Sequence, residues 1–388
     1  MTTLESPGPT IGVVGGGQLG RMLAEAASPL GVDIVVLDPT PDCPAATVST
    51  DQLVADFDDE EAITQLAERV DVLTFEIELA DQDVLDRVRA ETGVPVHPDP
   101  ATLRTIHDKL AQKRELQAAG IPVPPFRSVS SVEDIEDALE EYGAPVMLKA
   151  RTGGYDGRGN VPVESAAEAA NALDAVAGPA MVESFVDFER EISVIAAKGY
   201  GETRAYPVGE NIHEDEILRE TVVPARSDDA ALERAHEIAD GVLEVMDGRG
   251  IYGIELFETT GGEIVLNEIA PRPHNSGHWT IEGARTSQFE QHVRAVLGWP
   301  LGSTALRCQT VSTNLLADVD QSCPAALAHV ERVLESSTAN LHWYGKREAR
   351  PLRKMGHVTV LQADGESRDA QLERARSLRE AVTFRATE

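Results

Sequence analysis

The spacing of apolar positions along the chain predicts an α/β protein. Near the N-terminus the apolar run Thr10–Val14 is typical of a strand, and residues 21–27 continue with the spacing of a helix. A second apolar run at residues 32–37 completes a βαβ unit. Further strands are predicted at residues 70–75 and 94–96. The N-terminal part is therefore expected to be a Rossmann-like domain built on a parallel sheet.

Proline and glycine residues divide the rest of the chain. Pro98 and Pro100 end the first part, and a helix is predicted over residues 102–119, stopped by Gly120. Short strands and helices alternate from 128 to 182, longer strands with hairpin signals follow to 297, and short strands continue to Phe384. The predicted domains are 1–100, 101–300 (with a subdomain at about 123–185) and a small β-rich domain at 301–388.

The charge of the chain bears mainly on which partners are excluded. The chain has 66 acidic and 34 basic residues, a formal net charge of −32. The acidic residues are dispersed, which opposes nucleic-acid binding and indicates a halophilic protein of a salty cytoplasm. No apolar run reaches the roughly 18 residues that cross a bilayer, and no signal peptide is apparent, so no membrane partner is expected. The three cysteines have no metal-like spacing.

The first glycine motif allows two interpretations. Gly15, Gly17 and Gly20 lie between a strand and a helix, and Asp38 follows about 20 residues later, as in a dinucleotide-binding fingerprint. A nicotinamide dehydrogenase is therefore one hypothesis, and a tight structural turn is the other. In both cases backbone amides at a helix N-terminus could receive an anion.

A second glycine-rich segment favours phosphate chemistry. The predicted strand that ends at Lys149 leads into residues 150–160, which contain four glycines and two arginines. Glycines let backbone amides approach phosphate oxygens, and Lys149 adds a point charge. The segment lacks the Walker pattern, so it predicts a cationic flap between two strands; a solvated loop without a ligand is the alternative.

Two predicted strands carry a candidate metal site. If Gly261 and Gly262 form a two-residue hairpin loop, Thr260 pairs with Glu263, and Glu255 then lies opposite Glu268. Facing carboxylates repel each other unless a cation lies between them, and Mg²⁺ prefers oxygen ligands. An exposed acidic hairpin without a metal is the alternative in so acidic a chain.

These motifs resemble the ATP-grasp superfamily, and within it the N5-carboxyaminoimidazole ribonucleotide synthase family of purine biosynthesis. The resemblance covers nearly the whole chain, from residue 11 to about 360. The matching segments are residues 15–22, 74–78, 151–159, 211–213, 267–272, 274–280 and 342–344. Residues 274–280, His-Asn-Ser-Gly-His-Trp-Thr, are the most specific of them. The resemblance implies an ATP-grasp fold with an N-terminal pre-grasp domain, and an enzyme that uses ATP and Mg²⁺.

The resemblance also implies the residues of each part of the site. The nucleotide would be held by Lys109, Lys149, Gly154, Tyr155, Asp156, Gly157, Arg158, Gly159, Asn160, Glu183, Ser184, Phe185, Val186, Glu191, His213, Asn267 and Glu268. Glu255 and Glu268 would bind Mg²⁺. Aminoimidazole ribonucleotide would contact Gln18, Leu19, Glu76, Tyr155, Asp156, Arg158, Lys346, Arg350 and Arg353. The catalytic residues would be Arg272, His274, Asn275 and Asp156. A homodimer is expected from the same resemblance.

The implied reaction is the ATP-dependent carboxylation of aminoimidazole ribonucleotide by bicarbonate, through carboxyphosphate, with ADP and phosphate as products. Phosphoryl transfer of this kind depends on positioning and on neutralising charge, which the predicted lysines and metal can supply. The base that receives the amine proton is Asp156 or His274, and sequence alone does not choose between them. Other ATP-grasp ligases, of the formate-dependent transformylase or biotin-carboxylase type, are the alternatives. Ala270 departs from the superfamily, in which many members have an asparagine at that position.

Overall fold

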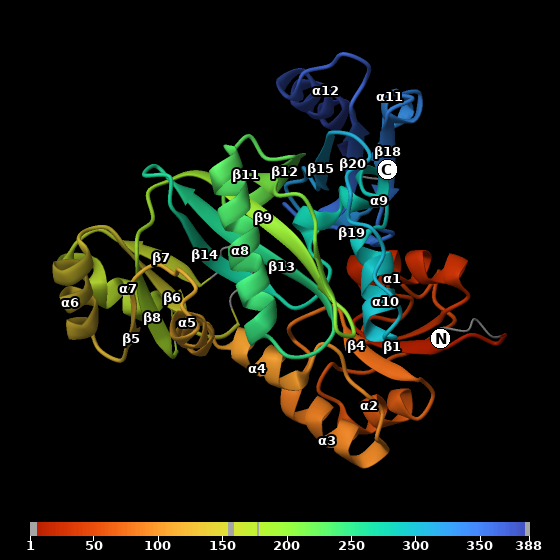
Figure 1. Ribbon diagram of the computed structural model, residues 1–388, viewed down its shortest axis with the longest axis horizontal. Coiled ribbons are helices and arrows are strands. Elements are labelled where there is room, and N and C mark those ends of the chain that lie inside the picture. The colour runs from red at the N-terminus through yellow and green to blue at the C-terminus, as the bar shows by residue number, and fades with distance from the viewer. Residues whose placement is uncertain (1–5, 154–158, 177, 385–388) are drawn as a thin grey trace.

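The N-terminal part of the chain forms the parallel sheet that its apolar runs predict. The computed structural model describes residues 6–153, 159–176 and 178–384 (Figure 1). The first sheet has the order β3-β2-β1-β4, and all its pairings are parallel. Residues 94–96 contribute only one bridge, between Leu73 and Val96. The elements of this part are β1 (Thr10–Val14), α1 (Gln18–Ala27), β2 (Asp33–Leu37), β3 (Asp51–Leu53), α2 (Glu60–Ala67), β4 (Val72–Phe75) and α3 (Gln82–Thr92).

The single helix predicted over residues 102–119 is wrong, because the chain turns at Asp108. Helix α4 (Pro100–His107) ends there and α5 (Lys109–Ala118) begins. Asp108 has an extended backbone (φ −102°, ψ 101°), and its carboxylate accepts the N–H groups of Leu110 and Ala111. This is the geometry of an N-cap, which satisfies amides that a new helix leaves without partners.

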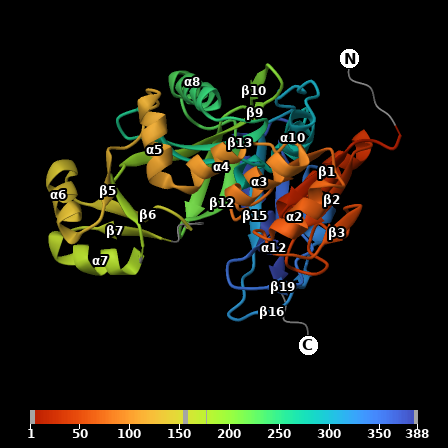
Figure 2. The same cartoon turned by 90° about the horizontal axis from the view of Figure 1, so that it is seen from below.

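A small antiparallel sheet lies at one end of the molecule. Its order is β5-β8-β6-β7, and two helices pack on it around a core that includes Ile135, Val146 and Val182 (Figure 2). The elements are β5 (Phe126–Val129), α6 (Val132–Tyr142), β6 (Val146–Ala150), β7 (Asn160–Val163), α7 (Ala169–Val176) and β8 (Ala180–Ser184).

The largest sheet runs through the centre of the molecule in the order β14-β13-β9-β11-β12-β15-β20-β18, with β10 paired to β9. Helix α8 covers one face, where Tyr252, Ile254 and Leu256 of β13 point into an apolar core. Alternate residues of β13 therefore point to the opposite face. The elements are β9 (Phe188–Lys198), β10 (Thr203–Ala205), β11 (Gly209–Glu214), β12 (Ile217–Val223), α8 (Asp229–Val245), β13 (Gly250–Thr259) and β14 (Ile264–Ala270).

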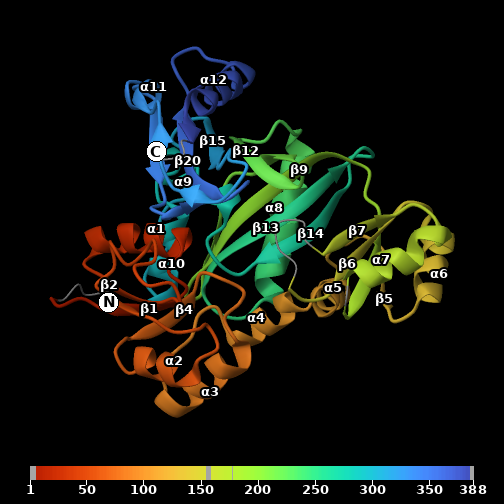
Figure 3. The same cartoon turned by 180° about the vertical axis from the view of Figure 1, so that it is seen from behind.

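The C-terminal strands extend this same sheet, because β15 pairs with β12. Helix α12 covers the added strands, and α10 packs against α1 of the first sheet (Figure 3). No helix in the described ranges is long and apolar enough to cross a membrane. The elements are α9 (Thr280–Gly283), α10 (Gln288–Val296), β15 (Thr310–Leu316), β16 (Cys323–Pro324), β17 (Leu327–Ala328), α11 (Glu331–Leu334), β18 (Ala339–Trp343), β19 (Glu348–Ala349), β20 (Lys354–Leu361), α12 (Arg368–Ala381) and β21 (Thr383–Phe384), with short 3-10 turns at Ser28–Leu30, Ala166–Glu168 and Asn275–Gly277.

Candidate active site

The β13–β14 hairpin brings the two predicted metal carboxylates together, although by another route than the sequence predicted. Glu255 does pair with Glu268. The predicted pairing of Thr260 with Glu263 is wrong, because the N–H of Thr259 bonds the carbonyl of Glu263 across a three-residue loop. A β-bulge then inserts one extra residue between the pairs Leu256–Leu266 and Glu255–Glu268, which restores the expected register.

The bulge also explains how two neighbouring residues share one face of the sheet. Leu266 and Ile269 are buried in the core beneath α8, three positions apart, whereas a regular strand would separate same-face residues by two. The intervening Asn267 and Glu268 are both only partly buried. Both are therefore presented on the face opposite α8, where Glu255 also lies.

The small sheet supplies a buried ion-pair cluster to this face. Glu183 of β8 is 3% exposed, and its Oε2 lies 2.8 Å from Nζ of Lys149. Its other oxygen, Oε1, lies 3.1 Å from Nζ of Lys113 on α5. Burial alone would raise the pKa of Glu183, but the two ammonium groups lower it to about 2. The Glu183 side chain thus holds Lys149, a contact that the sequence analysis did not foresee.

Helix α5 connects this cluster to the carboxylate pair. Nζ of Lys109 lies 2.6 Å from Oε1 of Glu268. The start of the helix is held to the end of β6, because Arg151 forms an ion pair with Asp108 and the Arg151 carbonyl accepts the N–H of Lys109. Lys109 and Lys149, far apart in sequence, therefore reach the same face of the central sheet.

The facing carboxylates are electrostatically strained. Burial, and then the charge of Glu268, raise the pKa of Glu255 to about 7. For Glu268, burial would raise the pKa, but Lys109 reverses the effect and lowers it. A divalent cation between the two carboxylates would offset their repulsion. A hard metal ion prefers oxygen ligands, so the pair fits such an ion. Among the residues that the structure describes, no group of three or more metal-ligating side chains is present, so phosphate or water oxygens would have to complete the coordination.

The segment after β14 folds back over Glu255. Nε2 of His274 lies 3.7 Å from Oε1 of Glu255, and Nδ1 lies 2.9 Å from the Ser276 hydroxyl. Gln288 holds the His274 backbone at both its N–H and its carbonyl. Gly253 makes this approach possible, because an added Cβ would lie 2.5 Å from Cβ of His274. Burial, and then nearby Arg272, lower the pKa of His274 well below its usual value, so the imidazole is neutral at pH 7.

Two neighbouring side chains retain unused hydrogen-bonding capacity. Arg272 forms a 2.8 Å ion pair with Glu78, and its Nε–H is buried without an acceptor. Asn275 has both side-chain polar atoms, Oδ1 and Nδ2, buried and without hydrogen bonds. Buried polar groups normally have partners, so these atoms are available to a polar ligand such as bicarbonate.

The remaining predicted nucleotide residues lie on the adjoining strands. Nδ1 of His213 on β11 lies 3.2 Å from Oε1 of Glu191 on β9. Burial would lower the pKa of His213, but Glu191 outweighs that effect and raises it. Ser184 ends β8, and Phe185 and Val186 lie in the link between β8 and β9, where Phe185 is exposed.

The first glycine motif is a structural turn whose amides are already bonded. The carboxylate of Glu76 accepts the N–H groups of Gly17 and Gly20, and Asp38 accepts that of Gly16. A dinucleotide pyrophosphate would need such amides at this helix N-terminus. Glu76 is also buried. The structure therefore gives the dehydrogenase hypothesis no phosphate site here.

One contact joins predicted substrate residues of the N-terminal and C-terminal parts. Nζ of Lys346 donates to Oε1 of Gln18 and to the carbonyl of Lys354. Leu19 is a core side chain, and Arg350 is exposed and paired with Glu348. Arg353 donates to the Glu348 carbonyl.

Lys354 was missed by the sequence analysis. Its positive charge opposes the rise in the pKa of Glu255 and adds to the lowering of the pKa of His274, so it lies near the site. Its position at the start of β20, next to the predicted Arg353, was the available signal.

The remaining predicted nucleotide-binding residues belong to the glycine-rich segment between β6 and β7. Gly159 and Asn160 border β7, with Asn160 paired to Lys149. Gly154, Tyr155, Asp156, Gly157 and Arg158 lie outside the described residues.

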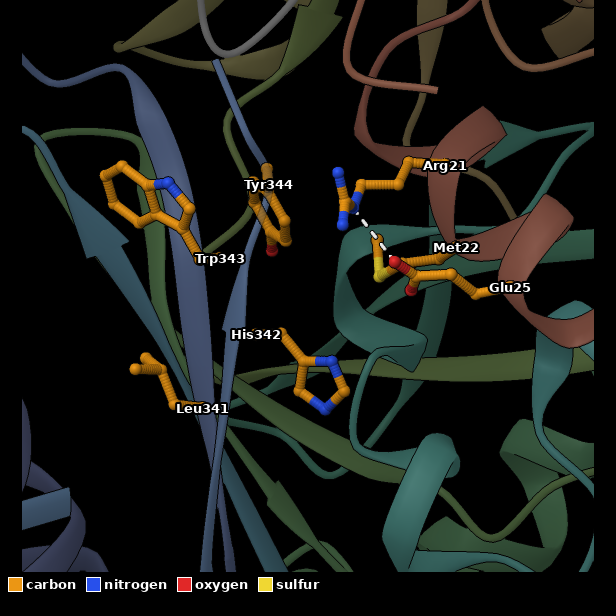
Figure 4. Close-up of a pocket in the computed structure, with 7 residues that line it drawn as sticks. All are labelled: Arg21, Met22, Glu25, Leu341, His342, Trp343 and Tyr344. Atoms are coloured by element: carbon orange, nitrogen blue, oxygen red, sulfur yellow. Dashed lines mark hydrogen bonds and ion pairs between the residues drawn. The ribbon is translucent and has the colours of Figure 1, made fainter. Parts of the chain in front are cut away.

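A separate cavity of about 230 Å³ lies between α1 and β18, lined by Arg21, His342 and Tyr344 among others (Figure 4).

Comparison with known proteins places these features in a family. Three family models match consecutive parts of the chain: a ribonucleotide synthetase preATP-grasp domain over residues 9–107, an ATP-grasp domain over 114–289, and a phosphoribosylaminoimidazole carboxylase C-terminal domain over 310–371. The chain is 44% identical over 357 residues to N5-carboxyaminoimidazole ribonucleotide synthase of Brucella melitensis biotype 1, covering 91% of this chain and 96% of that protein.

Solved structures agree with the sequence comparison. The crystal structure of N5-carboxyaminoimidazole ribonucleotide synthetase from Thermotoga maritima matches with a TM-score of 0.88 and 41% identity, over 98% of this chain and 100% of that one. The structure of N5-carboxyaminoimidazole synthase from Aspergillus clavatus, in complex with ADP and 5-aminoimidazole ribonucleotide, matches with a TM-score of 0.88 and 35% identity, over 96% and 98% of the two chains.

Proposed function

Because this chain belongs to the N5-carboxyaminoimidazole ribonucleotide synthase family of the ATP-grasp superfamily, we propose a role for each part of its site. The predicted fold class, ATP-grasp with a pre-grasp domain and a β-rich C-terminal part, is confirmed by the same comparisons. The chain is an ATP-dependent ligase that carboxylates 5-aminoimidazole ribonucleotide in purine biosynthesis. The structural observation that supports this activity is the convergence of Lys109 and Lys149 with the Glu255–Glu268 pair on one face of the central sheet.

The nucleotide end of the proposed site lies between the two sheets. Lys109 and Lys149 bind ATP phosphates, together with the predicted contacts from Gly154 to Asn160, of which residues 154–158 lie outside the described residues. Glu191, His213 and Asn267 complete the ribose end, with the segment from Glu183 to Val186 beside the adenine. Glu255 and Glu268 fit Mg²⁺, because a cation between the two facing carboxylates would offset the repulsion that helps to raise the pKa of Glu255. When bound, Mg²⁺ would neutralise charge on the phosphates.

The first chemical step joins bicarbonate to phosphate. A bicarbonate oxygen attacks the γ-phosphorus, the bond to the bridging oxygen of ADP breaks, and carboxyphosphate forms. Arg272 and Asn275 are proposed to hold bicarbonate, because Nε of Arg272 and both polar side-chain atoms of Asn275 are buried without partners. A fixed guanidinium and amide can stabilise the developing charge without reorganisation.

The second step transfers the carboxyl group to the acceptor. The exocyclic amine of aminoimidazole ribonucleotide attacks the carboxyl carbon, or CO₂ released from it, phosphate leaves, and the amine loses a proton. His274 lies beside the carboxylate pair, with Nε2 3.7 Å from Oε1 of Glu255, and its neutral imidazole is one candidate base for that proton. Asp156 is the other candidate base. Gln18, Leu19, Glu76, Tyr155, Arg158, Lys346, Arg350 and Arg353 are retained as the proposed acceptor contacts.

Three further parts of the proposal concern the molecule as a whole. Its net charge of −32 supports a halophilic protein of a salty cytoplasm. We retain the domain boundaries at residues 100 and 300 and the homodimer expected from the family. Light scattering across a range of protein and salt concentrations tests the dimer.

The experiment that tests the activity is ADP release at high salt with ATP, Mg²⁺ and bicarbonate, with and without aminoimidazole ribonucleotide. A large increase that requires both bicarbonate and the nucleotide is expected. ADP release that depends on bicarbonate but not on this nucleotide would move the acceptor elsewhere. Absence of ADP release under every condition would contradict the ligase.

A further inference from the structure

Lys113 is a buried cation to which neither the sequence nor the proposed reaction assigns a task. It lies on α5, one helical turn after Lys109, and is 2% exposed. Its ammonium is 3.1 Å from Oε1 of Glu183 and donates to the carbonyl of Leu266, also at 3.1 Å. Lysine is almost never fully buried without a compensating partner. At this depth Lys113 is shielded from the solvent-accessible face on which Lys109 and Lys149 lie.

Lys113 changes the charge that Lys149 can offer to a phosphate. Glu183 has one carboxylate oxygen on each lysine. With Lys113 present, the three groups have a net charge of about +1; without it, Lys149 and Glu183 would form a neutral pair. A neutral pair attracts a phosphate far less, because little water is present to screen the nearby carboxylate.

Lys113 also anchors the strand that bears the carboxylates. The Leu266 carbonyl that it binds immediately precedes the bulge residue Asn267 and the metal-site residue Glu268. The same helix places Lys109 against Glu268. One side chain therefore connects β8 of the small sheet with β14 of the central sheet, at the place where the two sheets enclose the nucleotide.

We propose that Lys113 is a positioning residue for ATP: it shares the Glu183 carboxylate, so that Lys149 keeps its positive charge for the phosphates, and it holds β14 in place beside them. Lys113 does not touch the nucleotide and acts through Glu183 and Leu266. The proposal rests on the proposed function, because it presupposes that ATP phosphates bind at Lys149.

The first test is the variant Lys113→Met, which keeps much of the side-chain volume and removes the charge. The KM for ATP and the dissociation constant for ADP, measured by calorimetry, should each rise about 10- to 100-fold, since a hydrogen bond or ion pair to a charged group is worth that much. The KM for aminoimidazole ribonucleotide should stay within about twofold of wild type. A purely structural role would not separate the two substrates.

Variants that differ in the charge of the Lys113–Glu183–Lys149 cluster give a second test, which does not rely on Lys113→Met alone. The double variant Lys113→Met/Glu183→Gln restores the net charge of about +1 and leaves no unpaired buried charge, so it should recover most of the ADP affinity. The single variant Glu183→Gln has one more positive charge and should bind ADP at least as tightly as the double variant. A double variant that bound ADP no more tightly than Lys113→Met would overturn the proposal.

A matched control is Lys198→Met. Lys198 also lies in the central sheet region, at the far end of β9, and donates to the carbonyls of Leu243 and Met246. The Lys198→Met variant should be less stable than wild type and should bind ADP with unchanged affinity. If Lys198→Met lost as much ADP affinity as Lys113→Met, the proposal for Lys113 would be contradicted. ADP binding by the wild type needs no acceptor, so failure of the acceptor-dependent assay would refute the proposed function and leave this comparison intact.

Discussion

Gly253 gives the sharpest test of the position assigned to His274. In the variant Gly253→Ala, the new Cβ would lie 2.5 Å from Cβ and 2.7 Å from Cγ of His274. Ordinary contact begins at 3.4 Å, so the two atoms must separate by about 0.9 Å. The His274 backbone cannot move freely, because Gln288 binds both its N–H and its carbonyl.

The expected result has two parts. Overpacking should cost about 1–3 kcal/mol of the free energy of unfolding. Displacing a reacting group by about 1 Å should lower kcat roughly 100-fold. The KM for ATP should change little, because Gly253 makes no side-chain contact with Lys109 or Lys149. Steady-state ADP release in the presence of both substrates measures the two constants, and urea denaturation measures stability.

The same substitution at another glycine is the control. At Gly241 on α8, an added Cβ would lie 3.6 Å from the nearest atom of Ile121, which is ordinary contact. Gly241→Ala should therefore be neutral or stabilising by about 0.5–1 kcal/mol, since alanine suits a helix better than glycine. If Gly253→Ala kept kcat within about twofold of wild type, the reasoning that places His274 at the reacting atoms would be refuted.

Three further predictions follow from other contacts. Glu268→Ala should abolish ATP turnover, by at least about 1000-fold, while circular dichroism shows an intact fold; normal turnover would defeat the metal assignment. Asp108→Ala should cost about 1–2 kcal/mol in urea denaturation, because α5 loses its N-cap and Arg151 its partner. The raised pKa of His213 adds stability that is fully present below its unfolded pKa of about 6.5 and is lost as the pH rises through the higher folded value. Glu191→Gln should remove this contribution, so the stability difference from wild type should be largest at low pH and shrink on the alkaline side.

The carboxylate hairpin shows how far sequence reasoning extends. The pairing of Glu255 with Glu268 could be predicted, because alternation and a glycine turn strongly constrain an antiparallel register. The exact turn was wrong by one residue, and the bulge at Asn267 compensated for it. A bulge depends on packing against the neighbouring strand and helix, which a single strand's sequence does not contain.

The helix prediction at residues 102–119 failed for a local reason that the sequence did contain. Asp108 immediately before Lys109 is an N-cap signal. Apolar spacing continues across it, so periodicity alone indicated one helix. The contact of Asp108 with Arg151, 43 positions later, accompanies the break.

The sequence by itself determined the family, the order of the elements and most of the residues that bear the chemistry, because these depend on local patterns and on segments of specific composition. Only the tertiary structure decided what each charged side chain faces. Glu76 has the residue type of a substrate ligand, and the fold places its carboxylate on the N–H groups of Gly17 and Gly20, 59 and 56 positions earlier. Lys113 has the residue type of a surface cation, yet it lies beneath the phosphate site. The physical reason is that the role of a charge depends on its burial and on its partners, and both are set by chain segments distant in sequence that meet only when the sheets pack together.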